Sequence, residues 1–396
     1  MPSRPLTTLF ALLILAACDR AGGSAQWGGT IDTLESGIEV VRNPAEGIWD
    51  SSTAWRLVEE MRIGSVEGEG PETFAQIIDL AVDGLGRVYV LDRQIQEIRV
   101  FDPDGSHVRT IGGPGGGPGE FIQADGMDFG PGGRLWVIDN NRPHYAVFDT
   151  AGTFVASYPR QVTRYGFGWP GGWTAGGELI DYSSAPHGDG NAAALVRYDT
   201  TARAFVDTAL LAQPDLESQF FDFRDSRGIG SIAGIPFAPR WHWRLGPTGT
   251  VWAGFAGSYL FHEITRNGDT LRAVERPGVS VAVSARERES AIADIREAAG
   301  AHAFDASRIP DVKPAFEGID VDDLGYVWVR RPAPDTASTS YDVFDPGGRL
   351  QGTLTAPALQ AESYLPLWIR GDTLYVVDRD ELGVQYVVRY RIENRS

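Results

Sequence analysis

Residues 80–92 read LAVDGLGRVYVLD, a pattern of two short strands joined by a glycine-containing turn. The pattern returns as MDFGPGGRLWVID at 127–139 and as IDVDDLGYVWV at 319–329. Apolar and polar side chains alternate on both sides of each turn, as half-buried antiparallel sheet requires. The repeat therefore predicts an all-β fold built from copies of one unit.

A third strand follows each pair and ends in a second turn. It reads IRVFDPDG at 98–105, YAVFDTAG at 145–152 and YDVFDPGG at 341–348, and a fourth strand comes after it. Four antiparallel strands in about 40–50 residues are typical of a β-propeller blade. Three weaker copies bring the count to six blades, whose second strands are expected to begin near Arg87, Arg134, Glu178, Thr250, Tyr326 and Thr373.

The last copy lacks a fourth strand, since the sequence stops soon after Ile392. At the other end of the chain, residues 55–63 alternate between apolar and polar side chains. Pairing this N-terminal segment with the last blade would close the ring and remove the exposed sheet edges of an open array. We therefore expect one six-bladed propeller over residues 53–396.

The repeat resembles NHL-type six-bladed propellers, particularly exported bacterial lipoproteins of this type. The matching segments are Ala81 to Asp92, Val100 to Gly105 and Gly113 to Phe121. The resemblance implies the same fold and little about function, because propellers host many unrelated activities.

The first 17 residues have the pattern of a secretory signal peptide, with Arg4, an apolar run at 9–15 and small residues before Cys18. The sequence LAAC at 15–18 resembles the bacterial lipobox, which implies that Cys18 is lipidated. Cys18 is the only cysteine among 396 residues and has no disulfide partner. Residues 18–52 are then an anchor and tether, and the protein faces the periplasm or the exterior from a membrane. The alternative is an ordinary signal peptide with an incidental buried cysteine.

The chain is acidic, with 53 Asp and Glu residues against 35 Lys and Arg residues and a formal net charge of −18. A surface of this charge repels phosphate backbones, so a nucleic-acid partner is not expected. The expected partners are the membrane, through the lipid anchor, and an unidentified protein or small molecule.

Two long connections, at 213–239 and 277–314, precede the fourth and fifth blades. Insertions in repeat proteins map to one face, so these segments are expected to form a shared cap over the central channel. In the second insert, Ser284 and Glu287 match a capping box and Gly300 can end a helix. A short helix is therefore predicted between them.

Polar residues near the entrances of the inner strands are the candidate ligand-binding residues. The run RWHWR at 240–244 is the most unusual, because alternation places its two arginines and its histidine on one side and both tryptophans on the other. This side would favour an anionic or carboxylate group; the alternative is aromatic packing with a satisfied histidine. The full candidate set is Asp79, Asp125, Arg240, His242, Arg244, Glu317 and Tyr364.

Enzymatic alternatives have weaker support in the sequence. FEG at 316–318 resembles the start of the first motif of calcium-dependent lactonase propellers, and the other calcium ligands have no clear match. The six histidines fall in different strand positions, which disfavours a zinc site. The glycine run at 112–119 has no Lys-Ser or Lys-Thr after it, and no nucleophile-elbow motif occurs. We therefore expect a binding or scaffolding module without a cofactor; a calcium-dependent hydrolase with its metal in the channel is the alternative.

Overall fold

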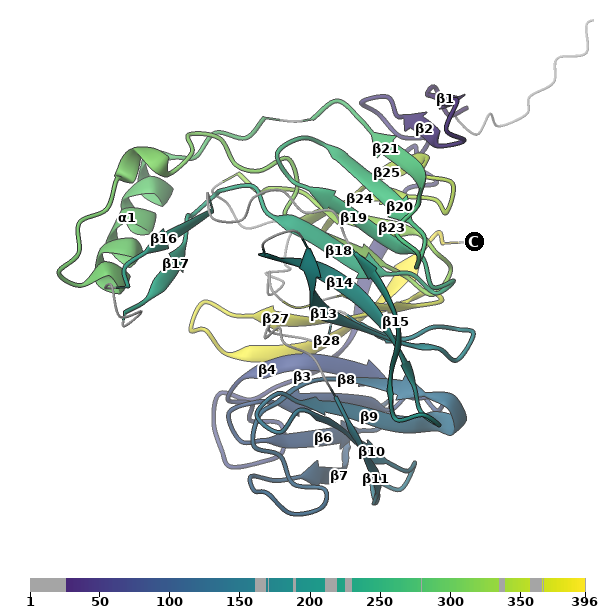
Figure 1. Cartoon of the computed structure of the whole chain (residues 1–396), viewed down its shortest axis with the longest axis vertical. Helices are drawn as coiled ribbons and strands as arrows, with labels where there is room; N and C mark the ends of the chain where they lie inside the picture. Colours follow the sequence, from purple (N-terminus) through teal and green to yellow (C-terminus); the bar gives the residue numbers. More distant parts are fainter. Residues whose placement is uncertain are drawn as a thin grey trace, which may run out of the picture.

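The computed structural model describes residues 26–160, 169, 171–187, 190–210, 219–224, 230–278, 280–334, 339–356, 365 and 367–395. These parts of the chain form six sheets, each with four antiparallel strands at least, which succeed one another along the sequence as the blades of a propeller (Figure 1). The predicted all-β six-bladed architecture is therefore confirmed.

Each blade runs from an inner strand to an outer one. The first blade consists of β4 (Ile77–Val82), β5 (Val88–Asp92), β6 (Glu97–Phe101) and β7 (His107–Gly112). The second consists of β8 (Ala124–Gly130), β9 (Arg134–Asp139), β10 (His144–Phe148) and β11 (Phe154–Pro159). The third consists of β12 (Gly172–Trp173), β13 (Leu179–His187), β14 (Gly190–Asp199) and β15 (Ala204–Leu210). The fourth contains β18 (Trp241–Leu245), β19 (Val251–Phe255), β20 (Leu260–Ile264) and β21 (Thr270–Glu275). The fifth consists of β22 (Gly318–Val321), β23 (Val327–Arg330), β24 (Thr339–Phe344) and β25 (Leu350–Ala356). The six second strands begin within one residue of the predicted positions.

The sixth blade combines the two ends of the propeller. It consists of β26 (Trp368–Arg370), β27 (Thr373–Arg379), β28 (Gln385–Glu393) and the N-terminal strand β3 (Arg56–Ile63). β3 pairs antiparallel with β28, so that Ile63 lies opposite Val387 and Arg56 opposite Glu393. The predicted closure of the ring is therefore confirmed.

Two strands lie in the range expected to be only an anchor and tether. β1 (Thr30–Thr33) pairs with β2 (Glu39–Arg42), and β2 pairs parallel with β21, which extends the fourth blade to six strands. Val40 and Val41 are buried in this arrangement. The folded part thus begins before residue 53, because these valines gain a hydrophobic contact that a tether would leave in water.

A repeated turn explains the Asp and Gly positions of the sequence motif. In the first blade the Asp83 side chain accepts hydrogen bonds from the backbone N–H groups of Leu85 and Arg87. Gly86 in that turn has a φ of 79°, a region that favours glycine. The fifth blade repeats this turn with Asp322, which accepts from Leu324 and Tyr326, and with Gly325 at a φ of 83°. These two motifs therefore build the tight connection between the first two strands of their blades.

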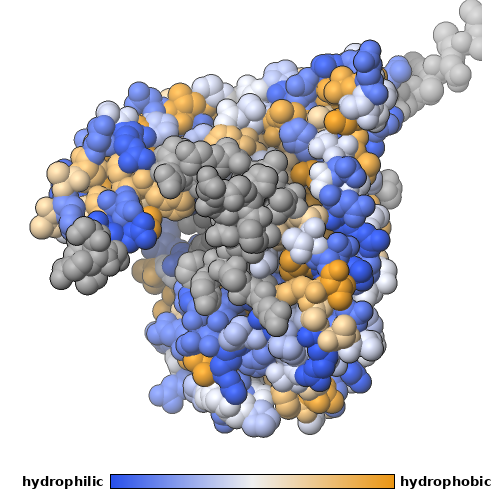
Figure 2. Space-filling view, viewed as in Figure 1, coloured by the Kyte–Doolittle hydropathy of each residue, from blue (hydrophilic) through white to orange (hydrophobic). Residues whose placement is uncertain are grey.

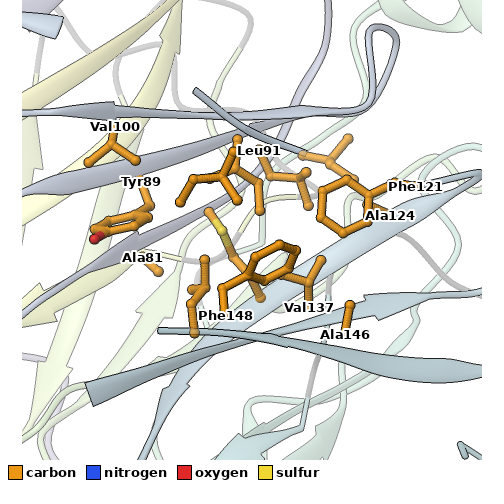
Figure 3. Packing of buried hydrophobic residues seen from close by; sticks show 14 residues of the cluster. Ala81, Tyr89, Leu91, Val100, Phe121, Ala124, Val137, Ala146 and Phe148 are labelled. Carbon is orange, nitrogen blue, oxygen red and sulfur yellow. The ribbon is translucent and has the colours of Figure 1, made fainter. Parts of the chain in front are cut away.

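The core lies between neighbouring blades. Figure 3 shows the cluster between the first two, where Leu91 and Phe121 pack with Val137 and Phe148. All four side chains are at most 1% exposed. Packing of this kind is repeated around the ring, and it holds the fold without a disulfide.

The two faces of the disc differ in what they carry. On one, here called the cap face, the inner strands begin; on the other, the turn face, the turns join first to second strands. The inserts meet beyond the cap face in an arm formed by α1 (Ala285–Ala299), β16 (Phe220–Asp222) and β17 (Ile232–Gly234), which projects at the left of Figure 1. Short 3₁₀ turns occur at Pro131–Gly133 and Ala306–Arg308. Among the described helices, none has the length and apolar character needed to cross a membrane.

The arm has a small core of its own. Phe221 and Phe223 of the hairpin segment pack with Ile295 and Ala299 of α1. The helix begins with the predicted capping box between Ser284 and Glu287 and ends at Gly300. The predicted helix and the packing of the two inserts against each other are thus confirmed for their described residues, and the covering of the central channel by these inserts stays a prediction.

Candidate functional site

The central channel holds ionisable side chains from several inner strands. Asp79 of β4 accepts hydrogen bonds from the backbone N–H groups of Met127 (2.7 Å) and Leu80 (2.9 Å). Burial raises the pKa of Asp79 to about 7, and the nearby charge of Asp128 adds to this shift. The carboxyl group of Asp79 is therefore largely committed to the backbone and is easily protonated.

Asp128 and the pair Arg244–Asp320 complete the polar lining of the channel. Asp128 accepts from the backbone N–H groups of Phe129 (2.7 Å) and Trp173 (2.6 Å), and burial raises its pKa to about 6. Arg244 Nη2 lies 3.2 Å from Asp320 Oδ1. Arg244 thus lies at a mixed-charge site, with Asp320 as its direct partner.

Asp125 and Glu317, two further candidates, lie near the cap-face ends of their strands and take part in ion pairs. Asp125 is 3.0 Å from Arg93 Nε and also accepts from Asn140 Nδ2 at 2.6 Å. Glu317 is 3.8 Å from Arg330 Nε. Burial raises the pKa of both carboxyl groups.

The run at 240–244 has the alternation expected from its sequence. Trp241 and Trp243 pack toward the third blade, where the Trp243 ring lies 5.0 Å from that of Tyr182. His242 lies on the other side, with its ring 5.6 Å from Phe316. Burial, with Arg240 and Arg244 nearby, lowers the pKa of His242 to about 4, so its imidazole is neutral at pH 7.

The candidate residues do not converge on one group. Asp79, Arg244 and the missed residues Asp128 and Asp320 share the channel, whereas Asp125 and Glu317 form separate pairs. Arg240 places its guanidinium against Gly234 of the arm. Tyr364 and Cys18 lie outside the described residues. Within the described part of the chain, no three His, Cys, Asp or Glu side chains are grouped so as to hold a metal ion.

A first cavity, the arm-root pocket, has a volume of about 760 Å³ and lies where three parts of the chain meet. The N-terminal segment contributes Arg42 and Asn43, the fourth blade contributes residues 257–260, 275 and 276, and the second insert contributes residues at its two ends. The ends of the insert are held together by backbone pairing, with Lys313 N donating to Val281 O at 2.8 Å. The pocket is therefore framed by ordered backbone.

The arm-root pocket combines charged and apolar groups, and its one acidic lining residue, Glu275, lies 2.8 Å from Arg42 Nε. Lys313 donates from Nζ to the Glu287 carboxylate and to Ala333 O (2.6 Å). Arg276 lies 2.8 Å from the buried Asp342 carboxylate. Val312 is 45% exposed. Charges held in place beside accessible apolar surface suit a ligand with both kinds of group.

A second cavity, the turn-face cavity, has a volume of about 960 Å³ and opens where the channel meets the turn face. Five blades contribute to its lining: Asp128, Phe129, Gly130, Pro131, Gly171, Gly172, Trp173, Thr174, Ala175, Gly176, Gly177, Arg244, Leu245, Gly246, Pro247, Val321, Asp322, Asp323, Leu367, Trp368, Ile369 and Arg370. Of these residues, only Arg244 belongs to the candidate set predicted from the sequence. The glycines predict turns in the sequence, but only the closed ring of blades brings these turns together around one cavity.

The blades, their closure and the channel define the class of protein, a six-bladed β-propeller. A family model described as a 6-bladed beta-propeller, DUF5128, matches residues 82–130. A solved structure of a Bacteroides fragilis protein classed as exported is similar with a TM-score of 0.51 and 11% identity, over 89% of this chain and 99% of that chain. No curated protein matches.

Two enzymes are among the other similar structures. Virginiamycin B lyase from Staphylococcus aureus has a TM-score of 0.45 and 11% identity, over 85% of this chain and 99% of that chain. A gluconolactonase from Xanthomonas campestris has a TM-score of 0.44 and 13% identity, over 80% and 87%. Similarity at this level concerns the fold, and it assigns neither activity to this chain.

Proposed function

We propose that this protein is an exported, lipid-anchored binding module that takes its ligand in the arm-root pocket. The observation that carries the proposal is the position of the pocket. It lies at the junction of the N-terminal segment, the fourth blade and the arm. Pockets at the interface between different structural units are common ligand sites, because the residues of each unit can contact the ligand.

The chemistry of the pocket favours an amphipathic ligand that carries a carboxylate. An ammonium group can donate three hydrogen bonds, and two from Lys313 go to Glu287 and Ala333, which leaves one for a ligand. Val312 and Leu260 supply apolar wall. The sequence of residues 240–244 also predicted an anionic ligand, and the arm-root pocket is a defined cavity in which such a ligand could bind.

The test uses straight-chain carboxylates from acetate to decanoate as probes. We expect isothermal titration calorimetry to show affinity that rises with chain length, because each added CH₂ buried contributes about 0.8 kcal/mol. Val312→Glu should weaken decanoate binding at least about tenfold, since it places a second carboxylate beside the first.

Val206→Glu is the matched control. Val206 is 45% exposed, as Val312 is, and lies on β15 away from the pocket. This variant should bind as the unaltered protein does. Equal loss in both variants, or no binding of any probe, would exclude the arm-root pocket as a carboxylate site.

A further inference from the structure

The turn-face cavity shares no lining residue with the arm-root pocket and lies at the turn-face end of the channel. Its rim is made by the turns between first and second strands, including Gly130–Pro131, Gly176–Gly177 and Gly246–Pro247. Small residues at these positions keep side chains out of the opening. Backbone N–H and C=O groups can therefore come close to a ligand.

Two tryptophans stand on opposite sides of the ring. Trp173 belongs to β12 of the third blade and Trp368 to β26 of the sixth, three blades apart, and both line the cavity. Both are half-buried. Trp173 is supported by Trp136, with ring centroids 5.0 Å apart, and Trp368 by Tyr375 at 5.5 Å. The indoles are thus held in place beside the cavity.

The charges around the cavity largely compensate each other. Arg244 is paired with Asp320, and Asp322 accepts from Arg395 Nη2 at 2.6 Å. Asp323 and Arg370, both exposed, lie at one edge, where Asp323 Oδ1 accepts from Gly371 N at 2.9 Å. The lining therefore offers donors and acceptors together without a strong net charge.

Hydrophobic residues on the face shown in Figure 2 are scattered in small groups. The turn-face cavity, by contrast, places its indoles in a concave site with polar groups around them. A neutral, polyhydroxylated ring presents the matching surface: apolar C–H faces for the indoles, and hydroxyl groups that both donate and accept. An anion would meet the exposed Asp323, and a long aliphatic chain would desolvate Asp323 and Arg370 without offering them hydrogen bonds.

We propose that the turn-face cavity is a binding site for a neutral saccharide. The sugar rings pack on Trp173 and Trp368, and the hydroxyls bond to Asp323, Arg370 and the backbone of the glycine turns. A cavity of about 960 Å³ is large enough for an oligosaccharide of a few rings.

The experiment blocks the cavity at a glycine that tolerates a side chain. Gly176 is exposed and has no positive φ, and a Cβ there would meet only Thr174 Oγ1, at 3.6 Å. Gly176→Phe therefore fills the opening with little strain. Gly84→Phe is the matched control, because Gly84 lies in the equivalent turn of the first blade, outside the cavity lining, with nothing within 4 Å of its Cβ position.

The probes are maltotetraose, cellotetraose, chitotetraose and an array of neutral glycans. At least one should bind the full-length protein and the Gly84→Phe variant, and should lose at least about tenfold in affinity for Gly176→Phe. Both variants should melt at the temperature of the unaltered protein, and decanoate binding should be unchanged. Failure of every glycan to bind, or equal binding to both variants, would overturn the proposal and leave the arm-root pocket untouched.

Discussion

Asp181 lies fully buried between the second and third blades and collects four donated hydrogen bonds from side chains. Arg160 donates to it from Nε (2.6 Å) and Nη2 (3.0 Å), Trp169 from Nε1 (3.1 Å), and Tyr145 from its hydroxyl. Removing one partner of such a group leaves the others desolvated and unpaired. The cluster is therefore sensitive to truncation even though its net contribution to folding is modest.

We expect Asp181→Ala to lower the free energy of unfolding by about 3–5 kcal/mol, because the Arg160 charge is left buried without its counter-ion. Urea unfolding at pH 7 measures the change. Asp222→Ala is the control: Asp222 pairs with Arg224 on the exposed arm hairpin and should change stability little. Similar losses in the two variants would show that burial does not set the cost.

The channel carboxyls predict a dependence of stability on pH. Burial raises the pKa of Asp79 from 3.8 to about 7, so the folded state keeps a proton that the unfolded chain has lost. Stability contributed by this group is present at low pH and is lost as pH rises through about 7. His242 acts in the opposite sense, because its lowered pKa means that the unfolded chain takes up a proton first as pH falls below 6.5.

Above pH 7 the His242 contribution is nearly constant and Asp79 dominates. We expect the free energy of unfolding to fall by about 0.4 kcal/mol between about pH 7 and pH 8.5, because Asp79 is already half-deprotonated at pH 7 and most of its loss of stability lies between about pH 4 and pH 7. In Asp79→Asn this decline should be smaller, whatever the absolute stability of the variant. Parallel pH profiles for the two proteins would mean that Asp79 titrates normally.

The sequence predicted correctly on which side of its strand a side chain lies, but it did not predict how deeply that side chain is buried. The period of two correctly separated the tryptophans of 240–244 from His242. The neutral state of His242 and the protonation of Asp79 depend on burial by other blades, which a local pattern does not contain. Asp128 and Asp320 were missed because an aspartate near a strand turn has the common role of bonding backbone N–H groups.

Among the strands, β3 is the one whose position matters most for closure. Its Ile63 is 4% exposed, and Trp55 just before the strand is 8% exposed. Trp55 packs on Trp328 of the fifth blade, with ring centroids 5.7 Å apart. The segment thus completes the sixth blade and also covers its neighbour.

Two truncations separate closure from the added strands β1 and β2. A chain that begins at residue 54 loses β1 and β2 but keeps Trp55 and β3, whereas a chain that begins at residue 65 loses both parts. The longer truncation should cost about 5 kcal/mol more, because it exposes an edge and removes the burial of Trp55 and Ile63. Thermal unfolding of both truncated proteins tests this, and equal melting temperatures would refute the role of β3.

The sequence could predict β3 but not β1 or β2. The segment at 55–63 alternates over a full strand length, and the last blade lacked a strand. β1 and β2 are four residues each, and β2 pairs in parallel with β21, more than 200 positions away along the chain. Short strands in non-local parallel pairs carry no signal within their own sequence.

At the scale of the molecule, repetition made the blade number predictable. Closure followed because an open ring would leave two unpaired edges. The cavities were not predictable in the same way. The arm-root pocket needs the N-terminal segment, a blade and an insert, and the turn-face cavity needs turns from five blades. No local pattern encodes such convergence, so the candidate residues chosen from the sequence describe the channel better than either cavity.

A lipid on Cys18 would hold the whole propeller at a membrane. The apolar run at 9–15 followed by Ala16, Ala17 and Cys18 favours lipidation of the only cysteine in the chain. The eight positions from Cys18 to Gln26 span at most about 29 Å when fully extended, so an acylated protein would stay close to the membrane surface.

We expect the unaltered protein to enter the detergent phase in Triton X-114 partition, and mass spectrometry to show an acylated N-terminal cysteine. Cys18→Ala should move the protein to the aqueous phase with its melting temperature unchanged, because Cys18 precedes every strand of the propeller. If both proteins partition alike and neither carries a lipid, the anchor does not exist and the chain is released after export.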